Sequence, residues 1–575
     1  MVTWAEVIRW DSAPLQGAVG EVNTAYNKVV ACSEDLRAVN TADGWHGTAA
    51  RAAANEVDQV IDGLEEYAAE VASLRRSAGD VGDAISGVMN GVKEVEGLAR
   101  AHHFAVGGDG AIIDNGPPPD TPEDQKEAVA RERATIAADL RDRVSEVLKS
   151  ATDIDDDFCL VLDRIMSGQT IDATGNDNEN TSLAAAGNSG AAMGSLSIPA
   201  PPPEGATAAQ NAAYWATLSE AQRTRLATDR PELVGPRDGF SAKQRDIANR
   251  ELLDRQRSRL RHERDELQRK ITEFPRTGAG QIKLNDRLEF DALKADLDEL
   301  DGKLRGLDDI DHRLAMSDPG SPNYDSTKQR PYVLRIDDTG AGRAIVAMGN
   351  PDTAQNVATY VPGTGSELSK VNGDLGRADS MVDAAQQAGA KTPSVITWIG
   401  YDAPPGLLEA ANESFADNGK HALDSFQDGL RESHQGVPSH NTVIGHSYGT
   451  TLVGHAARDE HLAVDNIVLV ASPGVGVDHA SQLNVPSDHV YSTTAANDAI
   501  NITNFPRVEG KGDPLDPLGP DPTDPEFGGK TFTSDPGPGG PILGNSEAAH
   551  SQYWTRDNPA LRDMGRIIAG KQPSH

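Results

Sequence analysis

The chain has 575 residues, too many for a single hydrophobic core, so we expect roughly three or four structural units. Hydrophobic residues make up 37% and aromatic residues 5%, which is typical of long helices and polar connections beside one well-packed domain. The 88 acidic residues exceed the 53 basic residues and give a formal net charge of -35. This charge disfavours nucleic acid and anionic membrane surfaces as partners of the chain as a whole.

The cysteines and the first residues of the chain bear on disulfide bonds, metal binding and export. Cys32 and Cys159 belong to no CxxC or His cluster, so we expect no metal site or disulfide framework, and one bridge between packed helices stays open. The start MVTWAEVIRWDSAP lacks a basic segment followed by an apolar core, and no apolar run approaches membrane-spanning length. We therefore expect no signal peptide and no transmembrane segment, and predict a cytoplasmic protein or one that is exported by another route.

The first part of the chain has the periodicity of helices. Apolar side chains recur at steps of three, four and seven between Ser12 and Asn40, and again from Val57 to Val88 beyond Trp45. This pattern predicts two antiparallel helices joined near Trp45. A third, charged helix from about Thr121 to Ser167 is expected to pack on them. Together these elements predict a helical domain over residues 1–169.

A change of composition separates this domain from a second helical region. Residues 170–206 are rich in Asn, Ser, Gly and Ala and end in PAPPPEG, a composition typical of a flexible linker. Residues 207–318 are helical again and include two charged arms with leucines at heptad-like spacing, joined by the turn PRTGAG. We interpret the Arg-rich first arm and the acidic second arm as mutually paired faces of a coiled-coil-like hairpin.

Short β-rich runs characterise residues 319–575. Seven runs begin at Tyr332, Arg343, Asn356, Ser394, Asn441, Asn466 and His489. The first two are close enough for a hairpin, and helical lengths separate most of the others. This alternation predicts an α/β fold with a mostly parallel sheet and helices on both faces.

One motif in this region has the context of a nucleophile elbow. Val443 and Ile444 run into GHSYG, from Gly445 to Gly449, and an apolar helical start follows. A strand, a sharp turn and a helix present the serine above the sheet edge, and the two glycines let strand and helix pass closely. We predict Ser447 as the nucleophile.

Chain order selects the partners of this serine. An orienting acid and then a base histidine are expected to follow it. Asp498 comes after the last β-rich run and is the favoured acid, with Asp478 as the alternative. Downstream of Asp498 only His550 and the terminal His575 remain, so His550 is the predicted base. The remaining candidates are interpreted as structural or surface histidines: His455, His479 and His489.

Two backbone N–H groups are needed for the oxyanion of the tetrahedral intermediate. The residue after the nucleophile, Tyr448, supplies one, and the loop VPGTGSEL supplies the other, where we favour Thr364. A serine triad requires no metal or organic cofactor, and we expect neither. The Asp- and Pro-rich segment before His550 lacks the EF-hand ligand pattern and is interpreted as a surface excursion.

Several motifs carry a family resemblance over residues 207–575: YWATLSEAQRTRLATDRPELVGPRDG, RDIANRELL, VPGTGS, WIGYDAP, GHSYGT and HSQYW. They resemble an actinobacterial α/β-hydrolase family of unknown function. The resemblance implies an α/β-hydrolase fold with Ser447, Asp498 and His550 as its triad. It also implies that the charged helical hairpin is a cap on, or an insertion in, the hydrolase.

The helical N-terminus carries a second resemblance. With Trp45, His46 and Gly47 at its turn, it resembles the WXG-type substrates of type VII secretion. That resemblance implies export by such a system and a small helical WXG-type partner protein. The acidic residue that often follows a tyrosine by four places in that family is shifted here, because Glu70 stands three places after Tyr67.

These patterns favour a serine hydrolase, esterase- or lipase-like, acting on a small ester or lipid-like substrate. An alternative is a type VII secretion-associated effector or interaction protein whose helical region binds a partner. A further alternative is a helical adaptor with an inactive hydrolase fold.

Overall fold

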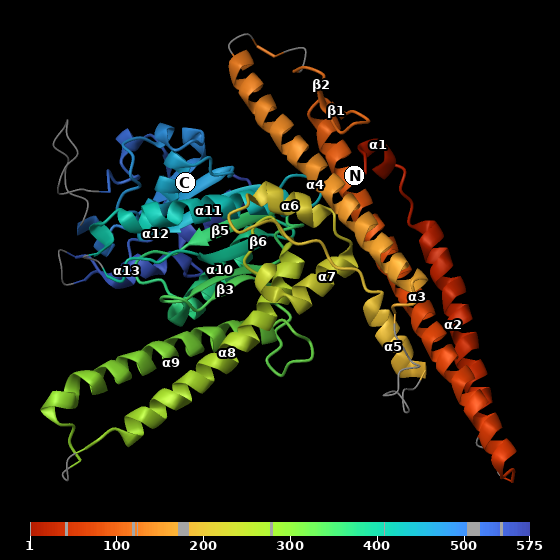
Figure 1. Cartoon of the computed structure of the whole chain (residues 1–575). Coiled ribbons are helices and arrows are strands. Elements are labelled where there is room, and N and C mark those ends of the chain that lie inside the picture. Colours follow the sequence, from red (N-terminus) through yellow and green to blue (C-terminus); the bar gives the residue numbers. More distant parts are fainter. Residues whose placement is uncertain are drawn as a thin grey trace. The chain divides into compact units, whose positions relative to one another are not determined.

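The computed structural model in Figure 1 describes most of the chain. The described residues are 2–40, 44–117, 121–122, 125–170, 183–276, 280–406, 409–502, 518–540 and 544–574. They form two compact units. The first comprises Met1–Ala206 with Gln210–Arg225, and the second comprises Thr207–Ala209 with Leu226–His575.

Long helices build the first unit. Their bounds are α1 Trp4–Val7, α2 Ala13–Asn40, α3 Thr48–Ala101, α4 Lys126–Met166 and α5 Leu183–Met193. Helices α2 and α3 confirm the predicted pair, and α4 confirms the third helix. The main core of the unit forms where α1, α3 and α4 meet, around the buried side chains of Trp4, Val88 and Leu140.

Three features of this unit differ from the sequence-based expectations. Helix α5 lies within the segment predicted as a linker and packs closely on α3, since a Cβ at Gly190 would lie 2.0 Å from the Ala69 carbonyl oxygen. The linker prediction is therefore wrong at α5, and residues 171–182 lie outside the described residues. Strands β1 (Phe104–Val106) and β2 (Ile112–Asp114) form an antiparallel hairpin, too short to show a period of two. Both cysteines are free and exposed, so the bridge left open by the sequence is absent.

The second unit is organised around an eight-stranded sheet. Its strands are β3 Pro331–Asp337, β4 Arg343–Met348, β5 Asn356–Val361, β6 Ser394–Ile399, β7 His440–His446, β8 Asn466–Val470, β9 Val490–Thr493 and β10 Lys530–Thr531. They lie in the order β10-β9-β8-β7-β5-β6-β4-β3. Strands β3 and β4 are antiparallel to their neighbours and the other pairs are parallel. The predicted mostly parallel sheet is confirmed.

Two hydrophobic cores cover the two faces of this sheet. Helices α10 (Val371–Gln387) and α14 (Pro559–Ile568) contribute to the core on one face. Helices α11 (Ser414–Ser433) and α12 (Tyr448–Asp459) contribute to the core on the other. The strands are buried almost throughout because they are covered on both sides, which explains their nearly continuous apolar sequences.

A helical hairpin, α8 (Ala242–Glu273) and α9 (Arg287–Ala315), projects from this unit (Figure 1). Arg257 of α8 contacts Asp308 at 2.7 Å and Asp311 at 2.9 Å on α9, which confirms the predicted charge pairing across the seam. Residues 277–279 of the predicted turn lie outside the described residues. Helices α6 (Ala208–Ala216) and α7 (Glu220–Asp229) precede the hairpin.

The base of α8 protects the edge strand of the sheet. The carboxylate of Asp246 accepts from the Val333 N–H at 2.9 Å, and the Asn249 amide donates to the Val333 carbonyl at 3.0 Å. The buried Arg245 guanidinium donates to the Leu334 carbonyl at 3.1 Å, beside a register shift in β3. These side chains pair backbone groups that an edge strand otherwise leaves open.

In the part of the chain that the structure describes, none of the helices combines the length and apolar character that a bilayer crossing requires.

Candidate active site

The turn between β7 and α12 holds Ser447 in an unusual backbone conformation. Its φ is +54° and its ψ is -130°, a region that side-chain-bearing residues rarely occupy. The turn is held from both sides, because the Ser447 N–H donates to the Val470 carbonyl and the Ser447 carbonyl accepts from the Thr450 N–H. The side chain is 6% exposed. Strained backbone that the surrounding fold enforces is found mainly at functional sites.

Close approach of neighbouring backbone explains the two glycines of the elbow. A Cβ at Gly445 would lie 2.7 Å from the Thr450 Cα, and a Cβ at Gly449 would lie 2.2 Å from the Val361 carbonyl oxygen. Neither glycine has a positive φ, so packing and not backbone conformation requires them. Gly445 and Gly449 thus lie at positions where any side chain would collide with neighbouring backbone.

The loop after β5 passes directly over Ser447. A Cβ at Gly363 would lie 2.7 Å from the Ser447 Cβ and 2.9 Å from the Tyr448 amide nitrogen. The N–H of Gly365 donates to the Pro404 carbonyl and that of Ser366 to the Gly363 carbonyl. Among the described residues, the amides of Thr364 and Tyr448 donate no hydrogen bond. Both N–H groups that were predicted to bind the oxyanion are therefore available as donors. The absence of a side chain at Gly363 lets the loop come close to Ser447.

Asp498 and His550 are in direct contact. His550 Nδ1 lies 2.7 Å from Asp498 Oδ1, and that oxygen also accepts from the Ile500 N–H at 2.8 Å. Asp498 is 0% exposed, whereas the alternative acid Asp478 is exposed. When His550 is neutral, this hydrogen bond to the Asp498 carboxylate places the proton on Nδ1 and leaves Nε2 as the acceptor.

Tyr553 completes the surroundings of the acid and was missed by the sequence analysis as a site residue. Its hydroxyl donates to Asp498 Oδ2 at 2.5 Å and accepts from the Ala495 N–H at 2.8 Å. Burial and the charge of Asp498 raise the pKa of the Tyr553 phenol, so it stays a neutral donor. Tyr553 stands three residues after His550 in HSQYW, and this spacing was the available signal.

His446, next to Ser447, joins the elbow to helix α13 (Glu547–Ser551), which carries His550. Its Nε2 donates to the His550 carbonyl at 2.9 Å, and its ring centroid lies 4.8 Å from the rings of both His550 and Trp554. Burial lowers the pKa of His446 well below its usual range, with smaller contributions from the charges of His550 and Arg377. His446 is thus neutral and acts as a fixed hydrogen-bond donor.

Ser447 and His550, the predicted nucleophile and base, are not joined by a hydrogen bond in the part of the chain that the structure describes. The described residues form no hydrogen bond between Ser447 Oγ and His550 Nε2, although the rings of His446 and His550 are in contact. In hydrolases without substrate this contact is often long and shortens when substrate binds.

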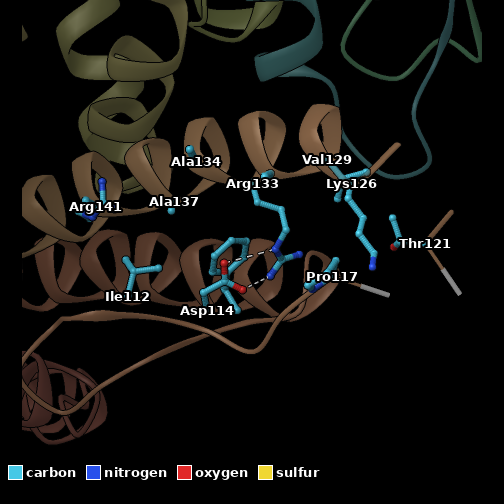
Figure 2. Close-up of a pocket in the computed structure, with 12 residues that line it drawn as sticks. Ile112, Asp114, Pro117, Thr121, Lys126, Val129, Arg133, Ala134, Ala137 and Arg141 are labelled. Atoms are coloured by element: carbon cyan, nitrogen blue, oxygen red, sulfur yellow. Dashed lines mark hydrogen bonds and ion pairs between the residues drawn. The ribbon is translucent and has the colours of Figure 1, made fainter. Parts of the chain in front are cut away.

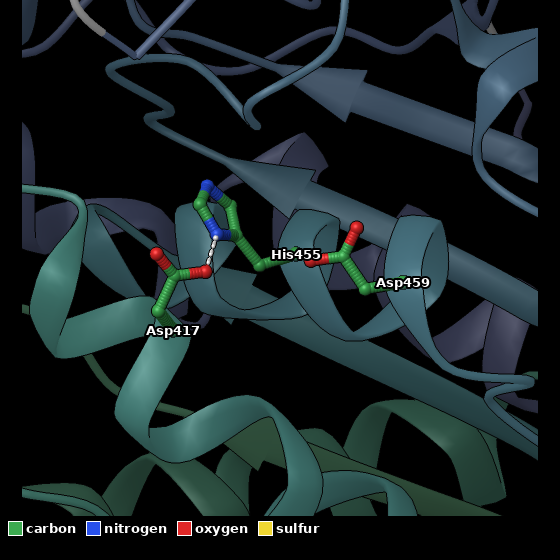
Figure 3. A group of neighbouring side chains, drawn as sticks. All are labelled: Asp417, His455 and Asp459. Carbon is green, nitrogen blue, oxygen red and sulfur yellow. Dashed lines mark hydrogen bonds and ion pairs between the residues drawn. The ribbon is translucent and has the colours of Figure 1, made fainter.

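His455 of α12 belongs to a separate polar group (Figure 3). Its Nδ1 lies 3.0 Å from Asp417 Oδ1, and Asp459 lies nearby. Lys420 contacts the carboxylates of Asp459 at 2.6 Å and Asp417 at 3.2 Å, and Arg458 also contacts Asp459. Cations already neutralise this group, so it fits a structural link between α11 and α12 better than a metal site.

The first unit contains a cavity of about 450 Å³ beside β1, β2 and α4 (Figure 2). Arg133 occupies one wall, where it pairs with Asp114, donates to the His102 carbonyl at 2.9 Å and lies over the Phe104 ring at 4.3 Å. The guanidinium therefore has its partners within the protein, and the cavity lining includes none of the predicted triad residues.

A match to a protein family agrees with this architecture. Residues 337–510 match the model of a family described as alpha/beta hydrolase. One solved structure, an alpha/beta hydrolase enzyme from a Medee basin deep-sea metagenome library, aligns with 30% of this chain and 71% of its own, at 14% identity and a TM-score of 0.18. The family match identifies an alpha/beta hydrolase domain in the second unit.

Relatives are found in mycobacteria. An uncharacterized protein of Mycobacterium tuberculosis is 29% identical over 393 residues, which is 64% of this chain and 56% of that protein. An uncharacterized protein of Mycobacterium bovis is 31% identical over 168 residues, which is 28% of this chain and 63% of that protein. The match thus spans little more than half the length of the larger relative.

Proposed function

Because the second unit carries an alpha/beta hydrolase domain, we propose that this protein is a serine hydrolase that cleaves an ester-like bond. The observation that carries the proposal is the strained backbone of Ser447, in an elbow whose neighbouring His446 ring contacts the ring of the Asp498-bonded His550. A fold alone does not give a function, but this combination of groups supports acyl transfer.

In the proposed reaction Ser447 Oγ attacks the ester carbonyl carbon and His550 Nε2 takes the hydroxyl proton. The carbonyl oxygen becomes an oxyanion that accepts hydrogen bonds from the N–H groups of Tyr448 and Thr364. Collapse of this intermediate breaks the bond to the alcohol oxygen, which receives the proton from His550. Asp498 stabilises the imidazolium during both steps.

The second half of the reaction releases the acid. His550 removes a proton from water, and the resulting hydroxide attacks the acyl group on Ser447. Return of that proton to Ser447 Oγ breaks the acyl–serine bond and liberates the carboxylic acid. These steps require no group beyond the side chains and amides already named.

A fluorophosphonate probe tests the proposal on the full chain. We expect covalent labelling of the wild type, none of Ser447→Ala and strongly slowed labelling of His550→Ala. A panel of nitrophenyl esters of increasing chain length then reports the acyl preference. Equal labelling of wild type and Ser447→Ala, or none of a folded wild type, would contradict it.

The first unit supports a second candidate function, the binding of a small helical partner. Trp45 is 63% exposed, Val60 52% and Tyr67 49%, all on α3 or just before it. Their exposure leaves these side chains available to contact a partner helix. Export of the wild type but not of Trp45→Ala, in a host with a working type VII system, is the expected outcome.

A further inference from the structure

A second group of histidine and carboxylate side chains lies between helices α11 and α12. It comprises His421 and Asp424 of α11 and Glu460, the residue that ends α12. One nitrogen or oxygen atom of each side chain lies within 4.8 Å of those of the other two. His421 and Asp424 share a face of α11 because they are three residues apart. Three side chains of metal-ligating type therefore converge from two helices.

These side chains do not bond to one another or to their surroundings. Within the residues that the structure describes, neither the His421 ring nor the carboxylates of Asp424 and Glu460 enter a hydrogen bond or an ion pair. The Oδ1 atom of Asp424 is nevertheless buried. A buried carboxylate oxygen without a donor is costly, and it is a place where a bound ion or water is expected.

The charges at this place favour a cation. Burial and the negative charge of Glu460 raise the pKa of Asp424, against the opposing charges of His421 and His461. Burial and the charge of Asp424 likewise raise the pKa of Asp428, one turn farther along α11, to about 6. Glu460 also stands at the C-terminal end of α12, where the helix dipole attracts positive charge. A cation between the two carboxylates would relieve their repulsion.

The neighbouring group around His455 shows the effect of protein cations in a similar setting. There Lys420 contacts the carboxylates of both Asp417 and Asp459, and Arg458 contacts Asp459. Hydrogen bonds from Arg458 and Lys420 hold the pKa of Asp459 below its usual range. The pKa of Asp424 is shifted in the opposite direction, because its burial is not offset in this way. The two groups therefore differ in whether the protein supplies the positive charge.

We propose that His421, Asp424 and Glu460 bind a divalent transition-metal ion such as Zn²⁺, with water in the remaining positions. An imidazole nitrogen with carboxylate oxygens suits such an ion, whereas Mg²⁺ and Ca²⁺ are held by oxygen ligands. Three protein ligands are sufficient for zinc when water takes the fourth position. The 13 positions from Ser447 to Glu460, at about 1.5 Å each, put the site about 20 Å from the elbow. The ion would fasten α11 to α12 and is separate from the proposed hydrolysis.

Isothermal titration calorimetry of the full chain, first stripped of metal by a chelator, tests this with zinc chloride as the probe. We expect saturable binding and a higher Tm with Zn²⁺, because an ion that binds only the folded state stabilises it. His421→Ala, Asp424→Asn and Glu460→Gln should each weaken the affinity at least about tenfold, since even an outer-shell partner of a metal contributes that much. Asp417→Asn is the matched control, because Asp417 is also a carboxylate of α11 that contacts a histidine, His455.

Asp424→Asn also separates metal binding from folding. Without metal, this variant should unfold at the same temperature as the wild type or a higher one, because it removes the repulsion between Asp424 and Glu460. With Zn²⁺ it should gain less in Tm than the wild type. A folded wild type that takes up no Zn²⁺, or three variants that bind it equally well, would overturn the proposal. A loss in Asp417→Asn as large as that in Asp424→Asn would also overturn it.

Discussion

The elbow around Ser447 and the α8–α9 hairpin place different demands on the amino-acid sequence. At the elbow, backbone atoms touch so closely that Gly445, Gly449 and Gly363 admit no side chain. In the hairpin, the partly buried Arg257 and the exposed Asp308 meet across a seam where many side chains would serve. A short motif therefore identifies the elbow, whereas only periodicity and charge identify the hairpin.

The largest expected effect follows from removing the charge that orients the base. Asp498→Asn should lower kcat towards nitrophenyl esters by about 10⁴-fold, the effect of this exchange in serine triads, because His550 takes the wrong tautomer. Asp478→Asn is the control, since Asp478 is exposed. A loss in Asp478→Asn with none in Asp498→Asn would make Asp478 the acid.

A methyl group at the elbow tests the close approach directly. Gly449→Ala would place a Cβ 2.2 Å from the Val361 carbonyl oxygen, so we expect a loss of about 3 kcal/mol of unfolding free energy or failure to fold. Gly373→Ala in α10, which has open space around it, should instead raise stability by roughly 0.5–1 kcal/mol. Urea unfolding measures both, and equal behaviour of the two variants would refute the argument.

A pH effect is expected where the hairpin joins the domain. Asp352 accepts from the Ala242 N–H at the start of α8 and from Ser433, and its burial raises the carboxyl pKa to about 6. Because the folded pKa lies above the unfolded value, its contribution to stability is present below about pH 4 and is lost as the pH rises through about 6.

Comparison of the wild type with Asp352→Asn isolates the contribution of Asp352 to the pH dependence of stability from those of other carboxylates. The unfolding free energy of the variant relative to wild type should increase between pH 4 and pH 7, by at most about 3 kcal/mol. A difference that is constant over this range would show that Asp352 does not titrate there.

Tyr553→Phe should have a smaller effect than Asp498→Asn. It removes one of three hydrogen bonds to the Asp498 carboxylate and leaves Oδ2 buried without a donor. We expect kcat to fall by about tenfold, in line with the loss of one buried bond to a charged group. Tyr324→Phe, at a residue that is 46% exposed, serves as the control and should leave kcat unchanged.

The smallest effect is expected in the hairpin seam. Arg257→Gln removes contacts with Asp308 and Asp311, yet we expect a loss of less than about 1 kcal/mol, because both carboxylates are exposed and solvent screens their charges. Thermal unfolding in low and high salt measures it. If Arg257→Gln lost as much unfolding free energy as Gly449→Ala, the hairpin would not be more tolerant of substitution than the elbow.

Much of the second unit followed from sequence patterns. All seven β-rich runs form strands, β3 to β9, since each is a short run rich in β-forming residues between turn residues. Strand β10, with two residues, has no such pattern. The order of the strands was also beyond prediction, because nothing in the sequence of β5 indicates that it lies between β6 and β7.

For the candidate site, chain order led to Ser447, Asp498 and His550, and their catalytic roles stay predictions. Tyr553 and His446 were missed because their roles depend on contacts between residues more than 50 positions apart. Arg245 and Asp246 were missed for a related reason. On a charged helix they look like surface residues, but the fold buries them against the edge of β3.

The position of β5 between β6 and β7 has one further consequence. Chain connections leave β5 and β7 towards opposite faces, because α10 packs with one core and α12 with the other. The order of strands reverses at this point, and such a topological switch opens a crevice at the carboxyl edge of a parallel sheet. Ser447 follows β7 and Gly363 follows β5, so the elbow and the loop that contacts it come from the two strands at which the order reverses.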